Sequence, residues 1–149
     1  MSVNGTDAYL GIKDLPPLVA RAVKVARGQG FAFSCRPEQG RLLHALAGGA
    51  SSSIGETGTG CGVGLAWLTS GAGPGVRLIS VEREPELAQV ASEVFADEPR
   101  VTVVRGEWRE IGEHGAVGLL GVGLSLFNIS EPTRIKRISY AGFCFKKKK

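Results

Sequence analysis

A chain of 149 residues with 43% hydrophobic and 21% charged residues has the composition of a globular domain, which excludes wholesale disorder. Its 22 glycines follow no three-residue period, so collagen is excluded, and tight turns or close approach of the backbone to a ligand are indicated. The net charge of +4 arises from seven cations after residue 133, because residues 1–133 hold eleven cations and fourteen acids. A mildly acidic body with a basic tail does not predict a nucleic-acid-binding face.

The cysteines and the apolar segments indicate where the protein works. Cys35, Cys61 and Cys144 are too few and too scattered for a disulfide framework or a zinc site. The first twelve residues lack the basic and apolar regions of a secretory signal, and the longest apolar stretch, 116–127, is about half the length of a membrane span. We therefore expect a soluble, cytoplasmic protein without a metal site or a membrane partner.

Two helices are predicted ahead of the first strand. The first spans residues 16–28, where prolines precede apolar residues at helical spacing. The second begins at Pro37 and ends at the glycines 48–49, where a left-handed glycine cap is expected. Its predicted buried side chains are Leu42, Leu43 and Leu46. Both helices are predicted to be packing elements.

Strands and helices then alternate. The predicted order is strand, glycine loop, helix, strand, helix and strand, at residues 51–57, 58–62, 63–68, 76–81, 85–95 and 101–104. Strands that alternate with helices at these lengths form βαβ units with right-handed crossovers. The predicted fold class is therefore α/β, a Rossmann-like parallel sheet with flanking helices.

The regular order ends at Ile111. Residues 112–127 show no clean periodicity, no convincing element is seen from 128 onward, and a single strand fits within 135–145. We therefore expect residues 1–111 to hold the N-terminal helices and the cofactor-binding βαβ units, and residues 112–149 to form an atypical, poorly ordered tail. A three-strand sheet, incomplete on its C-terminal side, would expose an edge and favour a homo-oligomer or aggregation.

Three features follow the predicted strands in positions that suit a nucleotide cofactor. The glycine loop 58–62 lets the backbone approach a ligand, and the helix that follows offers free N–H groups. Glu82 ends the second strand, where an acid can accept hydrogen bonds from both ribose hydroxyls. Residues 106–108 (GEW) place an acid and a flat ring after the third strand. Each feature alone also fits an ordinary turn, a surface acid or a core tryptophan; their combination favours a cofactor site.

These segments resemble the three cofactor motifs of Rossmann-like S-adenosylmethionine-dependent methyltransferases. The stretch 36–43 (RPEQGRLL) further resembles the helix before the first strand of bacterial-type small-molecule O-methyltransferases, so that the resemblance covers about residues 35–111. It implies S-adenosyl-L-methionine as cofactor and methyl transfer to a hydroxyl group of a small-molecule acceptor. The cofactor-binding residues that it implies are Glu56, Gly58, Thr59, Gly60, Glu82, Gly106, Glu107 and Trp108.

The family assigns a role to each motif. In such proteins the glycine loop contacts the methionine end, the acid after the second strand holds the ribose, and the Gly-acid pair after the third strand meets the adenine. Glu56, ahead of the glycines, favours this family over an NAD-type oxidoreductase, whose G-x-G-x-x-G fingerprint lacks its last glycine here. That oxidoreductase domain remains the alternative function.

The chain departs from the family in its strands. The first strand reads SSSIGET where an apolar, buried strand is expected, and residues 115–123 do not match the family's fourth strand, which ends in an acid. No catalytic base is identified, because His44 is expected to be a partly buried helix residue, His114 lies in a glycine-rich turn, and Cys61 is expected to line the loop without reacting. A truncated, inactive methyltransferase fragment is therefore a further alternative.

Overall fold

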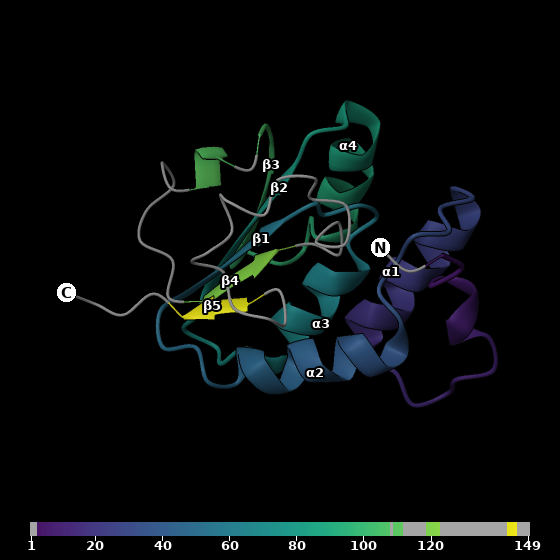
Figure 1. Ribbon diagram of the computed structural model, residues 1–149, viewed down its shortest axis with the longest axis horizontal. Coiled ribbons are helices and arrows are strands. Elements are labelled where there is room, and N and C mark those ends of the chain that lie inside the picture. The colour runs from purple at the N-terminus through teal and green to yellow at the C-terminus, as the bar shows by residue number, and fades with distance from the viewer. Residues whose placement is uncertain (1–2, 108, 112–118, 123–142, 146–149) are drawn as a thin grey trace, which may run out of the picture.

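The computed structural model of the protein describes residues 3–107, 109–111, 119–122 and 143–145. After a short 3-10 helix at Asp7–Tyr9, helices and strands alternate for most of the described chain (Figure 1). The four helices are α1 Pro17–Gly28, α2 Pro37–Ala47, α3 Val63–Gly71 and α4 Pro85–Val94. The strands are β1 Ser53–Thr57, β2 Arg77–Glu82, β3 Val101–Arg105, β4 Leu119–Val122 and β5 Phe143–Phe145.

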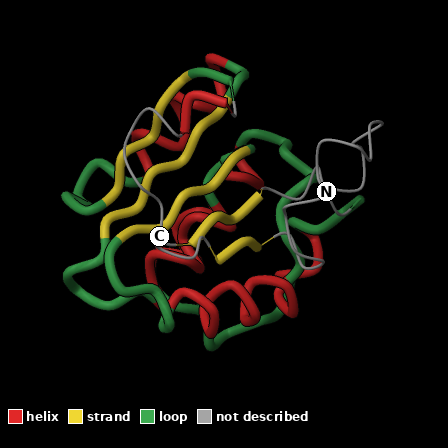
Figure 2. The backbone as a smooth tube through the Cα atoms, turned by 60° about the vertical axis from the view of Figure 1, so that its left-hand side comes forward, coloured by secondary structure: helices red, strands yellow, loops and turns green. Residues whose placement is uncertain are grey.

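The strands form one sheet in the order β3-β2-β1-β4-β5. Strand β1 pairs in parallel with both β2 and β4, β2 pairs in parallel with β3, and β5 is antiparallel to β4. Figure 2 shows these strands side by side in one twisted sheet. The predicted Rossmann-like parallel sheet is confirmed, and because the order reverses at β1, the carboxyl end of β1 is where a ligand is expected in such a fold.

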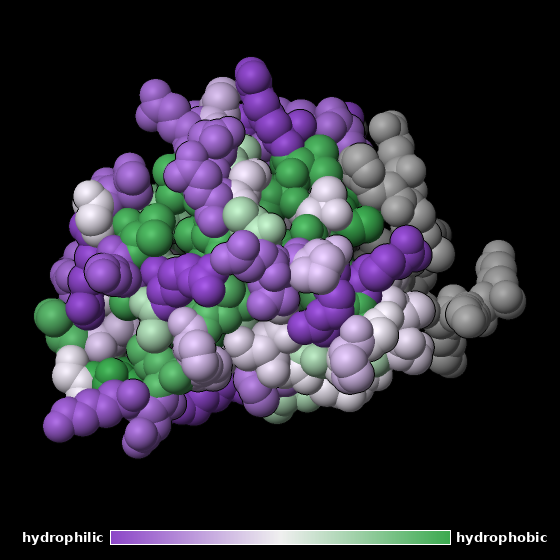
Figure 3. Space-filling view, turned by 180° about the vertical axis from the view of Figure 1, so that it is seen from behind, coloured by the Kyte–Doolittle hydropathy of each residue, from purple (hydrophilic) through white to green (hydrophobic). Residues whose placement is uncertain are grey.

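Helices α1 to α4 lie on the same side of the sheet (Figure 1). Right-handed crossovers place α3 and α4 on one face, and the two N-terminal helices pack against them, α2 on α3, and α1 on both α3 and α4. Each of α1, α2 and α4 begins with a proline in its first turn, as the sequence predicts. Seen from behind, hydrophobic residues lie among hydrophilic ones, as on most globular surfaces (Figure 3).

The core lies between this helix layer and the sheet. Its largest buried side chains come from β1, α3 and β2, where Ile54, Leu65, Leu68 and Leu78 are all almost fully buried. Helix α3 is buried on nearly every side because α1 and α2 cover the surface that it turns away from the sheet. Among the described residues, no helix is long and apolar enough to cross a membrane.

Strand β1 is buried along its whole length despite its polar sequence. Ser53, Glu56 and Thr57 are each less than a tenth exposed, so the polar composition does not place the strand at the surface. Buried polar groups are tolerated where they are hydrogen-bonded, and Glu56 accepts a hydrogen bond from Ser80 of the neighbouring strand. The departure of this strand from the family pattern therefore does not disrupt the centre of the sheet.

The prediction of a three-strand sheet is wrong, because the described sheet has five strands. Residues 119–122 form a fourth strand within 115–123, where the sequence predicts none, and residues 143–145 form a strand within the predicted range 135–145. Strand β4 is only four residues long and contains a glycine, so its own sequence carries too little periodicity, and its pairing with β1 defines it. The remainder of the predicted C-terminal tail lies outside the described residues.

Two details of the second helix differ from prediction. Leu42 is half exposed, and only Leu43 and Leu46 of the three leucines pack against the core, because the helix buries Gly40 and Ala47 instead, with Gly40 against Trp67 of α3. Gly48 caps the helix with a φ of −61°, which is right-handed, so the expected left-handed glycine cap is absent there. The contact with α3 fixes this end of the helix, because a Cβ on Gly71 would meet the backbone of His44.

Candidate functional site

The ends of β1, β2 and β3 meet at one edge of the sheet. The N–H group of Gly58 donates to the carbonyl of Val81 at 2.8 Å, and the N–H group of Gly106 donates to the carbonyl of Glu82 at 2.9 Å. The first residue of each of these two loops is thus hydrogen-bonded to β2. The three segments that the sequence predicts as cofactor motifs therefore begin side by side.

The glycine loop between β1 and α3 requires glycine for its backbone. Gly58, Gly60 and Gly62 have φ values of +78°, +54° and +89°, in the left-handed region that side chains disfavour. Space is limiting as well, because a Cβ on Gly60 would lie 2.9 Å from the ring of Phe31, and one on Gly62 would lie 2.7 Å from the ring of Phe95. The loop is consequently a tight turn held between two aromatic rings.

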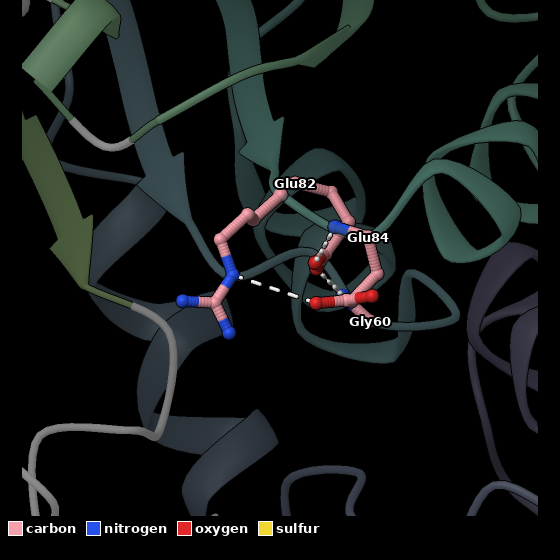
Figure 4. Close-up of polar contacts among 4 residues, drawn as sticks. Gly60, Glu82 and Glu84 are labelled. Atoms are coloured by element: carbon pink, nitrogen blue, oxygen red, sulfur yellow. Dashed lines mark hydrogen bonds and ion pairs between the residues drawn. The ribbon is translucent and has the colours of Figure 1, made fainter.

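The carboxylate of Glu82 binds two backbone N–H groups (Figure 4). One oxygen accepts from Gly60 at 2.8 Å and the other from Glu84 at 2.9 Å, so the side chain joins the glycine loop to the start of α4. A carboxylate offers about four acceptor positions, and these two bonds use one on each oxygen. Glu82 is only 7% exposed, and these two bonds leave one acceptor position on each oxygen unused.

Glu56 is a buried acid beneath the glycine loop, on β1. One of its oxygens accepts from the hydroxyl group of Ser80 at 2.7 Å. Burial raises the pKa of Glu56 to about 8, the hydrogen bond from Ser80 opposes this shift, and the nearby charge of Glu82 adds to it. Burial therefore favours the neutral form of the Glu56 carboxyl, which limits the negative charge beside Glu82.

Replacing Glu56 with glutamine is expected to remove a pH dependence of stability. The pKa of Glu56 rises from its ordinary value of 4.5 to about 8 in the folded chain, so between these values only the folded chain retains the proton. The free energy of unfolding of the wild type should then fall, relative to that of the Glu56→Gln variant, as pH rises through this window. Urea unfolding of both proteins from pH 5 to 8 measures this, and curves that run parallel would contradict the assignment.

Thr59 and Cys61 point into the protein from the glycine loop. The hydroxyl group of Thr59 lies 2.5 Å from that of Ser80, and Thr59 is only 5% exposed. Its side chain is therefore committed to an interior partner, which leaves its backbone as the part nearest a ligand. Cys61 is buried, and burial raises the pKa of its thiol to about 11, consistent with the expected unreactive role.

The segment after β3 is only partly described. Gly106 is tightly placed, because a Cβ there would meet the carboxylate of Glu110. Glu107 is exposed, and its carbonyl accepts the N–H group of Glu110 at 2.9 Å. Trp108 and His114 lie outside the described residues. The structure thus brings Glu56, Gly58, Thr59, Gly60, Glu82 and Gly106 to one edge of the sheet.

Two residues at this edge were missed by sequence reasoning. Ser80 contacts both Glu56 and Thr59, and Phe31 packs on Gly60 from the segment between α1 and α2. Ser80 could have been found, since it lies two residues before Glu82 and so on the same face of β2. Phe31 had no such signal, because its contact depends on how α1 and α2 pack.

Other candidate groups have structural partners. His44 is half-buried and meets the ring of Trp67 edge-on, with centroids 6.2 Å apart, as expected of a helix residue that packs. Cys35 lies 3.7 Å from the hydroxyl group of Tyr9, which also accepts the indole N–H of Trp67 at 2.9 Å. Within the described residues no three His, Cys, Asp or Glu side chains are grouped so as to hold a metal ion.

Solved structures share this fold. The chain is 27% identical to Rv0187 from MTB, solved with its cofactor bound, over 82% of this chain and 61% of that one, with a TM-score of 0.65. It is 21% identical to an O-methyltransferase from Bacillus cereus in complex with SAH, over 79% and 59% of the two chains, with a TM-score of 0.65. It is 24% identical to TomG from Streptomyces achromogenes, an O-methyltransferase involved in tomaymycin synthesis solved with SAM, over 89% and 64%, with a TM-score of 0.66.

These matches confirm the predicted resemblance at the level of the fold. The chain spans about three fifths of the length of those solved structures, at 59% to 64%. No protein-family model matches the chain, and no curated protein matches it in sequence. The described chain therefore has the Rossmann-like fold seen in O-methyltransferase structures.

Proposed function

We propose that the chain binds S-adenosyl-L-methionine at the glycine loop and Glu82, as the cofactor-binding part of a methyltransferase. The observation that carries this proposal is the Glu82 carboxylate, which is fixed by the N–H groups of Gly60 and Glu84 and retains one acceptor position on each oxygen. Two vicinal ribose hydroxyls match that arrangement. Structures of the same fold solved with SAM or SAH support the choice of cofactor.

The remaining residues fit the same ligand. The backbone of Gly58, which is exposed at the end of β1, suits the methionine end, and the resemblance assigns Gly106 and Glu107 to the adenine. When bound, the cofactor supplies a methyl group on a sulfonium centre. The chain's own residues hold the ribose and orient that group, so that catalysis comes from alignment of the two reactants.

We propose a hydroxyl group of a small molecule as the acceptor and a cytoplasmic location for the protein. The O-methyltransferases that share the fold support the first. The second is supported by Cys35 and Cys61, which are both free and buried, as in a reducing compartment.

Calorimetric titration with S-adenosylmethionine, S-adenosylhomocysteine and NAD tests the cofactor. Binding of the first two is expected, with no measurable heat from NAD. Tight binding of NAD without a response to the other two would contradict the proposal and favour the NAD-type oxidoreductase domain, whose glycine loop also occupies the first strand-to-helix turn.

A second assay separates an active enzyme from an inactive fragment. The chain is incubated with labelled S-adenosylmethionine and catechol-like or other hydroxylated acceptors, while light scattering reports its size. Transfer of label by a monodisperse monomer would contradict the fragment alternative. Cofactor binding without transfer, in an associating sample, would favour that alternative over an active enzyme.

A further inference from the structure

Three polar side chains from three different elements form a continuous chain of hydrogen bonds under the glycine loop. Ser80 on β2 is fully buried and lies opposite Glu56 of β1 in the strand register. Its hydroxyl group donates to Glu56 at 2.7 Å and lies 2.5 Å from the hydroxyl group of Thr59 in the glycine loop. Ser80 is therefore the bridge between a buried acid and the loop.

The protons available to Glu56, Ser80 and Thr59 determine the direction of each hydrogen bond between them. When Glu56 is ionised it can only accept, so Ser80 uses its single proton on Glu56 and Thr59 must donate to Ser80. When Glu56 is protonated it can donate to Ser80, and Ser80 can then donate to Thr59. Because both arrangements need the Ser80 hydroxyl group in the middle, its removal takes a buried partner from Glu56 and from Thr59 at once.

The surroundings of Glu56 make its charge sensitive to this bridge. The titratable groups described beside it are Glu82, at the end of the same strand as Ser80, and the Cys35 thiol, from the segment before α2. Gly64 of α3 closes the remaining side, since a Cβ there would lie 2.9 Å from Glu56. Burial and the charge of Glu82 favour the neutral carboxyl, whereas the Ser80 hydrogen bond favours the ionised form.

We propose that Ser80 is a positioning residue of the cofactor site, because its hydroxyl group ties Thr59 of the glycine loop to Glu56 and so couples the loop to the ionisation of that buried acid. This inference rests on the proposed function. The loop amides that would respond are those of Gly58, Gly60 and Gly62, which donate to Val81, Glu82 and Thr59 respectively.

Hydrogen exchange of these loop amides tests the bridge without any ligand. Ser80→Ala removes the middle hydroxyl group, Thr59→Val removes the loop hydroxyl group, and Ser80→Thr retains a hydroxyl group at the bridge. Thr69→Val is the matched control, since Thr69 is equally buried but donates to the carbonyl of Leu65 within α3. Loss of one buried hydrogen bond is expected to speed exchange at the loop about five- to tenfold.

Acceleration in Ser80→Ala and Thr59→Val, with recovery in Ser80→Thr and no change in Thr69→Val, supports the inference. Loop amides that exchange in Thr59→Val at the same rate as in Thr69→Val would overturn the inference that the Ser80 bridge holds the loop. If Ser80→Ala does not fold, Thr59→Val alone tests this inference.

A pH profile of S-adenosylmethionine affinity then tests the coupling to Glu56. The affinity for this cation should rise as Glu56 loses its proton, and Ser80→Ala should move the inflection to higher pH, because a hydrogen bond to the ionised form is lost. An inflection at the same pH in both proteins would overturn the coupling. No binding by the wild type at any pH would contradict the proposed function, whereas the exchange result would still report whether Ser80 holds the loop.

Discussion

Replacing Glu82 with alanine is expected to weaken S-adenosylhomocysteine binding about a hundredfold, since hydrogen bonds to a charged acceptor contribute about 1.5 to 3 kcal/mol. Two effects combine in this variant. The ribose loses its acceptor, and the N–H groups of Gly60 and Glu84 lose the carboxylate that holds them. Calorimetric titration measures the change.

Glu84→Ala is the matched control for that experiment. Its backbone N–H group still binds Glu82, while its exposed side chain forms an ion pair with Arg83 at 3.4 Å. Surface ion pairs of this kind contribute little, so the affinity should stay within about twofold of the wild type. An equal loss in both variants, or an unchanged affinity in Glu82→Ala, would mean that the ribose is held elsewhere.

Replacing Gly40 with alanine is expected to destabilise the fold by about 2 to 3 kcal/mol, because the core where α2 crosses α3 has no room for a methyl group. A Cβ on Gly40 would meet the indole ring of Trp67. That ring cannot shift freely, since its N–H group donates to the buried hydroxyl group of Tyr9 at 2.9 Å. Urea unfolding followed by circular dichroism measures the loss.

Gly28→Ala provides the control, because a Cβ on Gly28, the last residue of α1, would meet nothing within 4 Å. Alanine is also the better helix former, so this variant should be as stable as the wild type or slightly more stable. A Gly40→Ala protein as stable as Gly28→Ala would show that α2 and α3 can separate at this crossing without cost.

Much of the fold could be predicted because its signals are local. Prolines at helix starts, apolar residues at helical spacing and β-branched runs predict α1 to α4, β2 and β3 within a few residues of their observed bounds. Strand β4 depends instead on a distant partner, since it pairs with β1 more than sixty residues earlier in the chain. Such pairing leaves little trace in a segment of four residues.

The candidate site likewise has features with local sequence signals and features that depend on contacts between distant residues. The glycine loop and Glu82 could be located from their order after predicted strands, and the structure brings them together. The burial of β1 could not be predicted, because residue types alone do not show that Glu56 and Ser80 satisfy each other across two strands. The inward direction of Thr59 is equally hidden in the sequence, where it reads as one more loop residue.

A crystal structure of the protein with S-adenosylhomocysteine tests the central proposal most directly. We expect ligand at the carboxyl end of β1, with both ribose hydroxyls about 2.5 to 3.0 Å from the oxygens of Glu82. Glu82 should keep its bonds to Gly60 and Glu84 in that complex. Ligand bound away from the glycine loop, or a ribose without contact to Glu82, would contradict the proposed cofactor site.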